Sequence, residues 1–224
     1  MSTAASVTMT GAEFHRLIGS VLPCAASDDD LPVLSAVHLE TGPHGAYAVA
    51  TNRYIFAAAR HPSPSARRAH REATIPRTAA AAMLRLVRRS DPHVAVRISP
   101  AREAVLRTAA GITYRTTAPA AYHGFPNWRT QLTRLLACEP AEPGEPVHID
   151  AAFLARFRAV RDDDAWPLQV TIRRRTPGEH VVIVSAGDWF LGAIASIHTP
   201  ASAVTADPAA AWRADLGPAP ARAA

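Results

Sequence analysis

The chain has 224 residues, of which 48% are hydrophobic, so it can bury one large core or two small ones. Its formal net charge of +5 is carried by Arg without any Lys, and this basic balance favours a polyanionic partner such as DNA. The two cysteines, Cys24 and Cys138, do not form a CxxC pair, and no apolar run is long enough to span a membrane. These features argue against a disulfide scaffold and against an integral membrane protein.

One pattern of elements recurs three times along the chain. The first copy begins with Val7–Val21, in which a short strand ends before Thr10 and the Thr10 side chain can cap the helix that follows. Phe14, Leu17 and Ile18 follow at helical spacing and share one face of that helix. Strand-like runs follow at residues 32–40, 45–52 and 54–60.

The second and third copies have the same order of elements. Residues 73–91 contain a strand and a helix with Met83, Leu86 and Val87 on one face, followed by strands at 93–99, 103–109 and 112–118. Residues 147–149 predict a strand and Asp150 a helix cap, after which strands are expected at 168–174, 180–186 and 190–197.

We therefore predict an α+β fold of three strand–helix–strand–strand–strand units, with the helices on one face of antiparallel sheets. Residues 1–136 would form a complete domain of two units, and residues 147–199 half of another domain. Residues 137–146 are rich in Pro, Glu and Gly, which predicts a linker, and the Ala/Pro-rich residues 200–224 predict a disordered tail.

Arg side chains recur on the predicted solvent-facing sides of the three helices. They are Arg16 in the first helix, Arg85, Arg88 and Arg89 in the second, and Arg156 in the third. Such a surface would bind the phosphates of double-stranded DNA without reading its sequence. An ordinary solvated helix face would give the same pattern, and both interpretations stay open.

Two stretches carry a resemblance to a known family. Residues 31–60 read LPVLSAVHLETGPHGAYAVATNRYIFAAAR, and residues 125–129 read FPNWR. They resemble the LP(I/V)LSGV, ATDRYRLA and FPDYRR segments of the bacterial DNA polymerase III beta subunit, the sliding clamp, with Asn52 in place of Asp. Residues 149–191 are similar to the second half of that family's last domain. The resemblance implies the clamp fold, non-specific DNA binding as a processivity factor in replication, and a cytoplasmic, nucleoid-associated protein.

The resemblance also implies a cleft in which clamps bind short apolar peptides of DNA polymerases and repair proteins. The implied residues of this cleft are Thr51, Arg53, Tyr54, Ile55, Phe56, Pro126, Phe153, Gly192, Ala193 and Ile194. Ile194 and Ala195 replace the family's Met–Pro, which leaves the shape of the pocket open. Core packing is the alternative explanation for Ile55 and Phe56.

The chain departs from the family in having three units where a clamp chain has six. The matching parts are the middle domain and half of the last domain, so a ring cannot close between first and last domains as it does in the family. A half domain would also expose an apolar face. One hypothesis is that two chains pair their third units, which makes the protein a homo-oligomer.

We expect no enzymatic activity and no cofactor. The sequence has no phosphate-binding P-loop, no GxGxxG motif and no His or Cys residues at metal-ligand spacing. The Asp runs at residues 28–30 and 162–164 could bind Mg²⁺ in a nuclease, although their position after helices favours a role as helix stops. The alternative from another class is a clamp-derived adaptor, decoy or inhibitor that binds proteins and does not encircle DNA.

Overall fold

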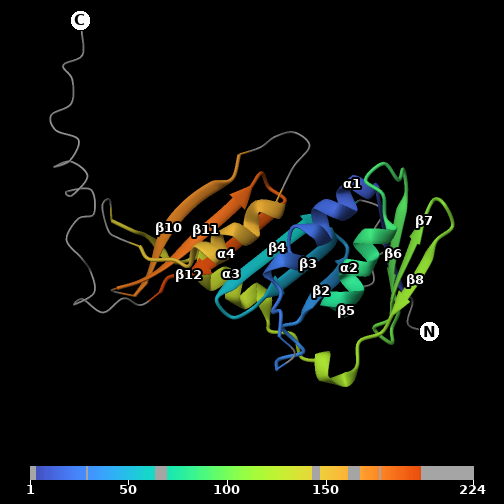
Figure 1. Ribbon diagram of the computed structural model, residues 1–224, viewed down its shortest axis with the longest axis horizontal. Helices are drawn as coiled ribbons and strands as arrows, with labels where there is room; N and C mark the ends of the chain where they lie inside the picture. The colour runs from blue at the N-terminus through green and yellow to red at the C-terminus, as the bar shows by residue number, and fades with distance from the viewer. Residues whose placement is uncertain are drawn as a thin grey trace, which may run out of the picture.

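The computed structural model describes residues 4–28, 30–63, 70–142, 147–160, 167–176 and 178–197 (Figure 1). The first unit contains strands β1 (Ala5–Met9), β2 (Ala36–Gly42), β3 (Gly45–Thr51) and β4 (Ile55–His61), with helical segments α1 (Gly11–Phe14), η1 (His15–Gly19) and η2 (Leu22–Cys24). The second contains β5 (Arg71–Pro76), α2 (Arg77–Leu86), β6 (Val94–Ile98), β7 (Ala104–Thr108) and β8 (Thr113–Thr116). The remaining elements are η3 (Ala120–Tyr122), α3 (Trp128–Leu136), β9 (Glu139–Pro140), α4 (Ala151–Arg156), η4 (Phe157–Ala159), β10 (Gln169–Thr176), β11 (Glu179–Ala186) and β12 (Phe190–Ala195).

The first two units are joined by an exchange of strands. β1 of the first unit pairs with β6 of the second, and β5 of the second pairs with β2 of the first. A four-stranded sheet results, in the order β1-β6-β7-β8. Because each unit supplies its first strand to the sheet of the other, neither sheet of this region is made by one unit alone.

The third unit extends the sheet of the first unit. β12 lies antiparallel to β4, with Ala193 opposite Phe56 and Ile194 opposite Ile55. The result is an eight-stranded sheet in the order β5-β2-β3-β4-β12-β11-β10-β9. Of the predicted linker, residues 137–142 are described and include β9, whereas residues 143–146 and the predicted tail at 200–224 lie outside the described residues.

The helix starts follow the capping residues of the sequence. The Thr10 hydroxyl accepts a hydrogen bond from the Glu13 N–H at 3.2 Å, and the Glu13 carboxylate accepts one from the Thr10 N–H at 2.7 Å, which completes a capping box. The Asp150 carboxylate accepts a hydrogen bond from the Ala152 N–H at 2.7 Å. The predicted apolar face of the first helix is confirmed, since Phe14, Leu17 and Ile18 are all at most 2% exposed.

Three details differ from the predicted units. Residues 147–149 form no strand, so the third unit lacks the first strand that the other two units exchange. Residues 128–136, expected only to close the second unit, form the helix α3. α2 ends at Leu86 because the next residue, Val87, has an extended backbone. Arg88 and Arg89 therefore follow the helix and are not part of it.

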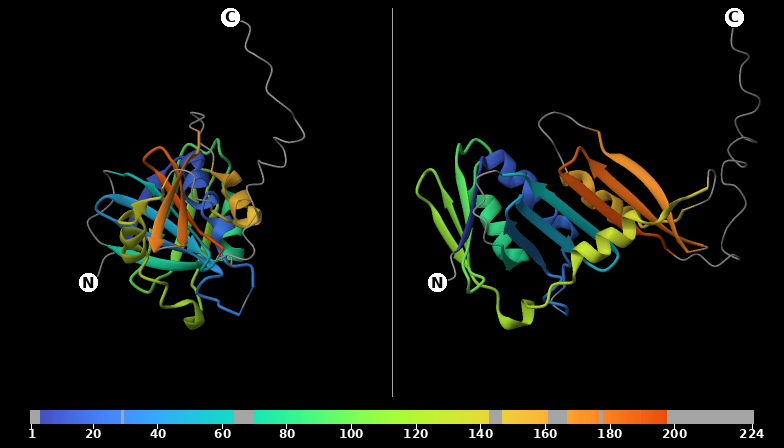
Figure 2. Two further views of the ribbon diagram at one scale, coloured as in Figure 1. Left: turned by 90° about the vertical axis from the view of Figure 1, so that its left-hand side faces the viewer. Right: turned by 180° about the vertical axis from the view of Figure 1, so that it is seen from behind.

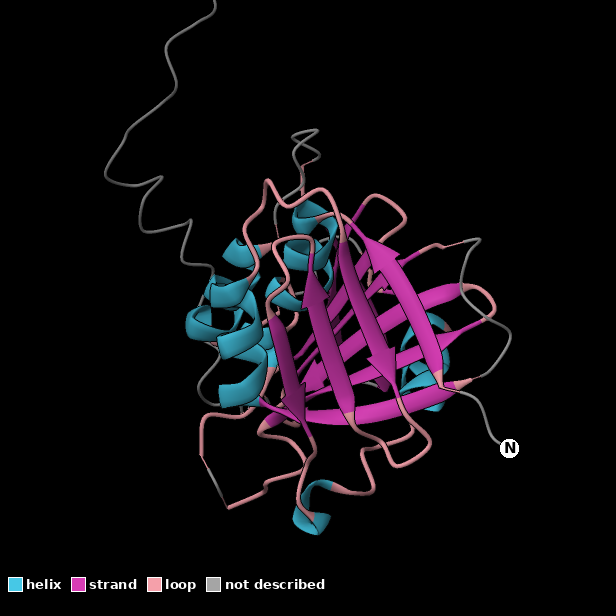
Figure 3. Ribbon diagram, turned by 90° about the vertical axis from the view of Figure 1, so that its right-hand side faces the viewer, coloured by secondary structure: helices cyan, strands magenta, loops and turns pink. Residues whose placement is uncertain are grey.

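The predicted α+β fold with antiparallel sheets is confirmed, and only the expectation of helices on one face is wrong, since helices cover both faces of the eight-stranded sheet. α1, η1, α2 and η4 supply Phe14, Leu17, Met83 and Phe157 to the main core on one face. On the other face, Trp128 and Leu132 of α3 pack with Phe56 and Ile183. Figure 1 shows α4 in front of the strands, and the right-hand view of Figure 2, from behind, shows α3 in front. Figure 3 shows helices on both sides of the strands.

The third unit leaves an apolar strip exposed on β10. Val170 lies opposite Val184 and Ile172 opposite Val182, so both point to the face that carries the main core. Their exposed fractions are nevertheless 55% and 39%, and Leu168, two residues before Val170, is 38% exposed. In the second unit, the corresponding inward residues of β6 are buried. The strip, defined as Leu168, Val170 and Ile172, is therefore a half-covered core face.

Candidate protein-interaction groove

A groove of about 570 Å³ lies on the face of the eight-stranded sheet that α3 covers, which is within the usual range for ligand-binding clefts. Its floor comes from β4, β11 and β12, and its sides come from α3, the Thr51–Ile55 turn and the loop before β2. The lining residues are Leu31, Val33, Leu34, Thr51, Arg53, Tyr54, Ile55, Phe56, Phe125, Pro126, Trp128, Gln131, Arg134, Leu135, Cys138, Arg175, Val181, Ala193 and Ala195.

Most of the cleft residues expected from the sequence lie together in this groove. The pairing of β4 with β12 places Phe56 opposite Ala193, so segments far apart in the chain share one floor. The expected residues that line the groove are Thr51, Arg53, Tyr54, Ile55, Phe56, Pro126 and Ala193. Of these, Ile55 is only 1% exposed, and its side chain packs in the main core.

Gly192, Ile194 and Phe153 do not line the groove. Side chains alternate along β12, so Gly192 and Ile194 point to the opposite face from Ala193. A Cβ on Gly192 would come within 2.2 Å of the Phe157 ring, and Ile194 is fully buried in the main core. Phe153 instead stacks on Tyr54, with ring centroids 5.8 Å apart, so it contacts the groove only through that rim residue.

A tight turn fixes one wall of the groove. The Asn52 side-chain oxygen accepts hydrogen bonds from the N–H groups of Tyr54 and Ile55, at 3.1 and 2.9 Å. The Thr51 hydroxyl accepts one from the Arg53 N–H at 3.2 Å and donates one to the Ile55 carbonyl at 2.7 Å. Arg53 has a φ of +81°, which these bonds support. Asn52 thus accepts the bonds that an Asp would accept, and the turn presents Tyr54 with 59% of its surface exposed.

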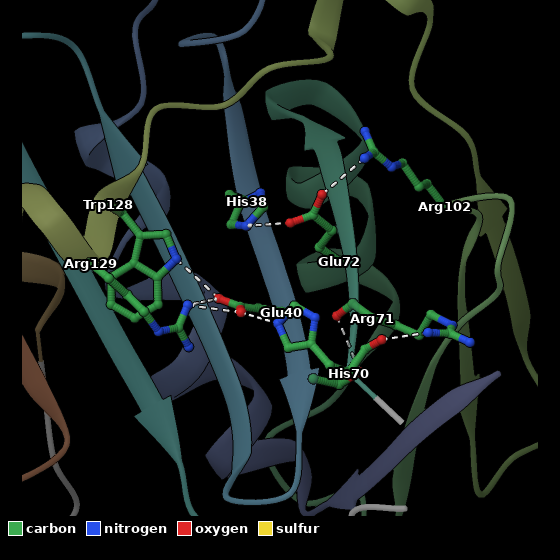
Figure 4. A network of polar contacts seen from close by, with 9 residues as sticks. His38, Glu40, His70, Arg71, Glu72, Arg102, Trp128 and Arg129 are labelled. Carbon is green, nitrogen blue, oxygen red and sulfur yellow. Dashed lines mark hydrogen bonds and ion pairs between the residues drawn. The ribbon is translucent and has the colours of Figure 1, made fainter. Parts of the chain in front are cut away.

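A buried carboxylate fixes the opposite wall (Figure 4). Glu40 of β2 has only 4% of its side chain exposed and accepts hydrogen bonds from the Trp128 indole N–H at 3.0 Å and from the Arg129 guanidinium at 2.8 Å. The His70 ring also contacts this carboxylate. Burial by itself raises the pKa of Glu40, but the hydrogen bonds from Arg129, His70 and Trp128 outweigh it, so the pKa is lowered overall.

A second anchor of this wall is a buried histidine. The His38 ring stacks on Phe125, with centroids 4.8 Å apart and an interplanar angle of 11°. Burial lowers the pKa of His38, while Glu72, whose carboxylate lies 3.9 Å from the His38 Nε2, acts in the opposite direction. The neutral ring therefore holds Phe125 in place at the edge of the groove. No local pattern of residues indicates this network, because its members come from β2, from β5 and the residue before it, and from α3 and the loop before it.

The Arg residues expected to face DNA lie in different surroundings. The Arg16 guanidinium lies 5.1 Å from the centre of the Trp189 ring. Arg156 donates hydrogen bonds to the carbonyls of Pro23 and Ala25, at 3.0 and 3.4 Å, and so attaches α4 to η2. Arg85 is exposed in the last turn of α2, and Arg88 and Arg89 are exposed after that helix. Only these last three lie together.

Two further findings concern metal binding and membrane spans in the described residues. Among them, no group of three His, Cys, Asp or Glu residues is arranged to hold a metal ion. The Asp run at 162–164 and Asp29 lie outside the described residues. No helix in the described part of the chain is long and apolar enough to cross a membrane.

Comparison with known proteins identifies the family. Residues 8–117 match the central domain of the DNA polymerase III beta subunit. The chain belongs to the beta-clamp family. This family is non-enzymatic. No curated protein sequence matches the chain.

Beta-clamp structures from several bacteria share the fold. The beta subunit of Thermotoga maritima superposes with a TM-score of 0.65 at 15% identity, covering 87% of this chain and 65% of that one. A griselimycin-bound clamp of Pseudomonas aeruginosa gives 0.64 at 14% identity, with coverage of 87% and 65%. A putative beta subunit of Eubacterium rectale gives 0.67 at 8% identity, with coverage of 87% and 66%. The chain thus spans slightly less than two thirds of the length of these clamps.

The Glu40 network generates a prediction about stability and pH. A carboxyl group with a lowered pKa in the folded state contributes stability above its unfolded pKa of 4.5 and loses it as the pH falls through the folded pKa. We expect Glu40→Gln to lower the free energy of unfolding at pH 7 by about 1–3 kcal/mol. The difference between variant and native protein should shrink below pH 4.5 in urea titrations followed by circular dichroism.

Glu142→Gln is the matched control, because Glu142 pairs with Arg174 at 3.4 Å while 73% of its side chain is exposed. Its effect should stay below about 1 kcal/mol. A difference between Glu40→Gln and native protein that is the same at pH 7 and pH 4 would contradict the assigned role of the carboxylate.

Proposed function

We propose that this beta-clamp-family chain is a protein-interaction module that binds short peptide segments of DNA polymerases or other replication and repair proteins in the groove. The observation that carries the proposal is the groove itself, in which seven of the ten residues expected from the clamp family converge. Those segments would insert large apolar side chains against Phe56, Val181 and Ala193.

The physical properties of the groove support a peptide ligand. Its lining is mostly apolar and aromatic, with a few polar groups at the rim, as in sites that bury apolar side chains and orient them by hydrogen bonds. Its walls are held by the Asn52 turn and by Glu40, independently of any ligand. A preformed groove loses less conformational entropy on binding, which favours recognition of a flexible peptide.

The test is binding of a fluorescein-labelled peptide taken from the clamp-binding segment of a DNA polymerase. Tyr54→Ala removes an exposed ring at the rim without opening the core, so we expect the dissociation constant to rise about 5- to 30-fold. Tyr122→Ala, a half-buried tyrosine outside the groove, should leave it unchanged. Equal effects of the two variants, measured by fluorescence anisotropy, would contradict the proposal.

A second candidate function is non-specific association with double-stranded DNA, favoured by the cluster of exposed Arg85, Arg88 and Arg89 and by the net charge of +5. We expect salt-sensitive, sequence-independent binding that falls in Arg85/Arg88/Arg89→Ala, with a salt slope reduced by about 1 per lost phosphate contact.

The matched control is Arg97/Arg107/Arg115→Ala, which removes the same charge from exposed positions on the outer side of the four-stranded sheet. Band-shift titrations at several salt concentrations compare the two. An equal loss of DNA affinity in both triple variants would show that only the net charge matters. Peptide binding without any DNA binding would favour the interaction module alone.

We also propose that a second copy of the chain covers the exposed strip of the third unit. The first two units show how such units complete each other, by placing helices and sheets over a shared core. Two third units brought together would bury Val170 and Ile172, whose exposure is otherwise unfavourable.

In sedimentation experiments, we expect the average molecular mass to rise toward that of a dimer as the protein concentration increases. Val170→Asp/Ile172→Asp should remove this association, whereas Ile112→Asp, at a residue 40% exposed elsewhere, should not. A native protein that remains monomeric at tens of micromolar would rule out the covering copy.

A further inference from the structure

The charged side chains at the rim of the groove are all positive. Three arginines line it, Arg53 from the turn after β3, Arg134 from α3 and Arg175 from β10. All three are exposed, and none of the lining residues is Asp or Glu. Three elements that are separate in sequence therefore bring guanidinium groups to one opening.

Several other arginines of the described chain lie next to a carboxylate. Arg60 pairs with Asp188 at 2.8 Å, Arg102 with Glu72 at 3.0 Å and Arg174 with Glu142 at 3.4 Å. Arg115 and Arg129 likewise have Glu partners. Within the described residues, the side chains of Arg53, Arg134 and Arg175 have no such partner.

Hydrogen bonds between β10 and the end of α3 hold two of these arginines beside the groove. Arg173, the neighbour of Arg175 on β10, donates hydrogen bonds to the carbonyls of Leu136 and Cys138, at 3.3 and 2.8 Å, and so attaches the end of α3 to β10. Arg134 and Arg175 are thereby carried on two elements that are fixed to each other. Like charges around an apolar cleft concentrate the electrostatic field in it and attract a ligand of opposite charge.

We infer that the partner segment bound in the groove is an acidic peptide, in which one or two large apolar residues are flanked by Asp or Glu. The inference rests on the proposed peptide-binding function and specifies its partner. The apolar residues would contact the floor at Phe56, Val181 and Ala193, and the carboxylates would pair with the guanidinium groups at the rim.

A single-stranded nucleic acid also carries negative charge, but it fits this groove less well. Stacking of bases needs accessible aromatic faces in a row. Trp128 and Phe56 are only 8% and 9% exposed, and Phe125 is stacked on His38. Tyr54, at 59% exposure, is the accessible ring of the lining, and one face of it is stacked on Phe153.

The experiment compares three synthetic dodecapeptides on the full-length chain. They share two Leu and one Phe and differ only at four flanking positions, which are Asp, Asn or Lys. At low salt, the Asp peptide should bind at least about tenfold more tightly than the Asn peptide, and the Lys peptide most weakly. The difference should shrink at 300 mM salt, since exposed charges are then screened.

Charge reversal provides the second part of the experiment. Arg134→Glu/Arg175→Glu should reverse the order, so that the Lys peptide binds more tightly than the Asp peptide. The matched control Arg97→Glu/Arg107→Glu changes the net charge equally, on the outer side of the four-stranded sheet, and should preserve the order. Unchanged affinity of the Asn peptide in Arg134→Glu/Arg175→Glu would show that the groove itself is intact.

The outcomes separate the inference from the function on which it rests. Equal affinity for the three peptides would overturn the acidic partner and leave peptide binding in place. Absence of binding by all three would overturn both. Competition by a short oligothymidylate at the same concentration as the Asp peptide would assign the groove to nucleic acid and overturn the peptide partner.

Discussion

The antiparallel pairing of β12 with β4 is the interaction on which the groove and the third unit depend. Five residue pairs join the two strands, from Phe190 opposite Ala59 to Ile194 opposite Ile55. Hydrogen bonds continue the ladder at both ends, from Arg60 to Trp189 and from Ala195 to Tyr54. Without this pairing, the turn that presents Tyr54 and the strand that carries Ala193 would belong to separate sheets, and neither would form a groove alone.

The two faces of this pair of strands have different roles. One face, with Gly192 and Ile194, packs against Phe157 and joins the third unit to the main core. The other, with Phe56 and Ala193, is covered only in part by α3 and remains accessible as the floor of the groove. Rigid attachment on one side therefore supports recognition on the other, since the position of each floor residue is set by the packing beneath it.

The sequence predicts much of this arrangement because several of its signals are local. Helix caps such as Thr10 and Asp150, helical spacing and strand alternation each depend on neighbouring residues, and they identify the three units and the buried helix face. The features that sequence reasoning missed depend on partners distant in the chain. The strand expected at 147–149 does not form, and the unit lacks the neighbour with which the other units exchange strands. The attachment of Arg156 to Pro23 and the Glu40 network are likewise invisible without the fold.

The exchange of first strands between the first two units has a consequence for how the chain reaches its native state. β1 pairs with β6, so the residues near position 7 cannot form their strand pairing until the residues near position 96 are present. A nascent first unit therefore lacks β5, the partner at one edge of its own sheet, until the second unit has been synthesised. Contacts so distant in sequence slow folding, because a long loop must close before they form. The two units should consequently fold in one cooperative step, and a fragment ending at residue 62 should not be a stable intermediate on the ribosome.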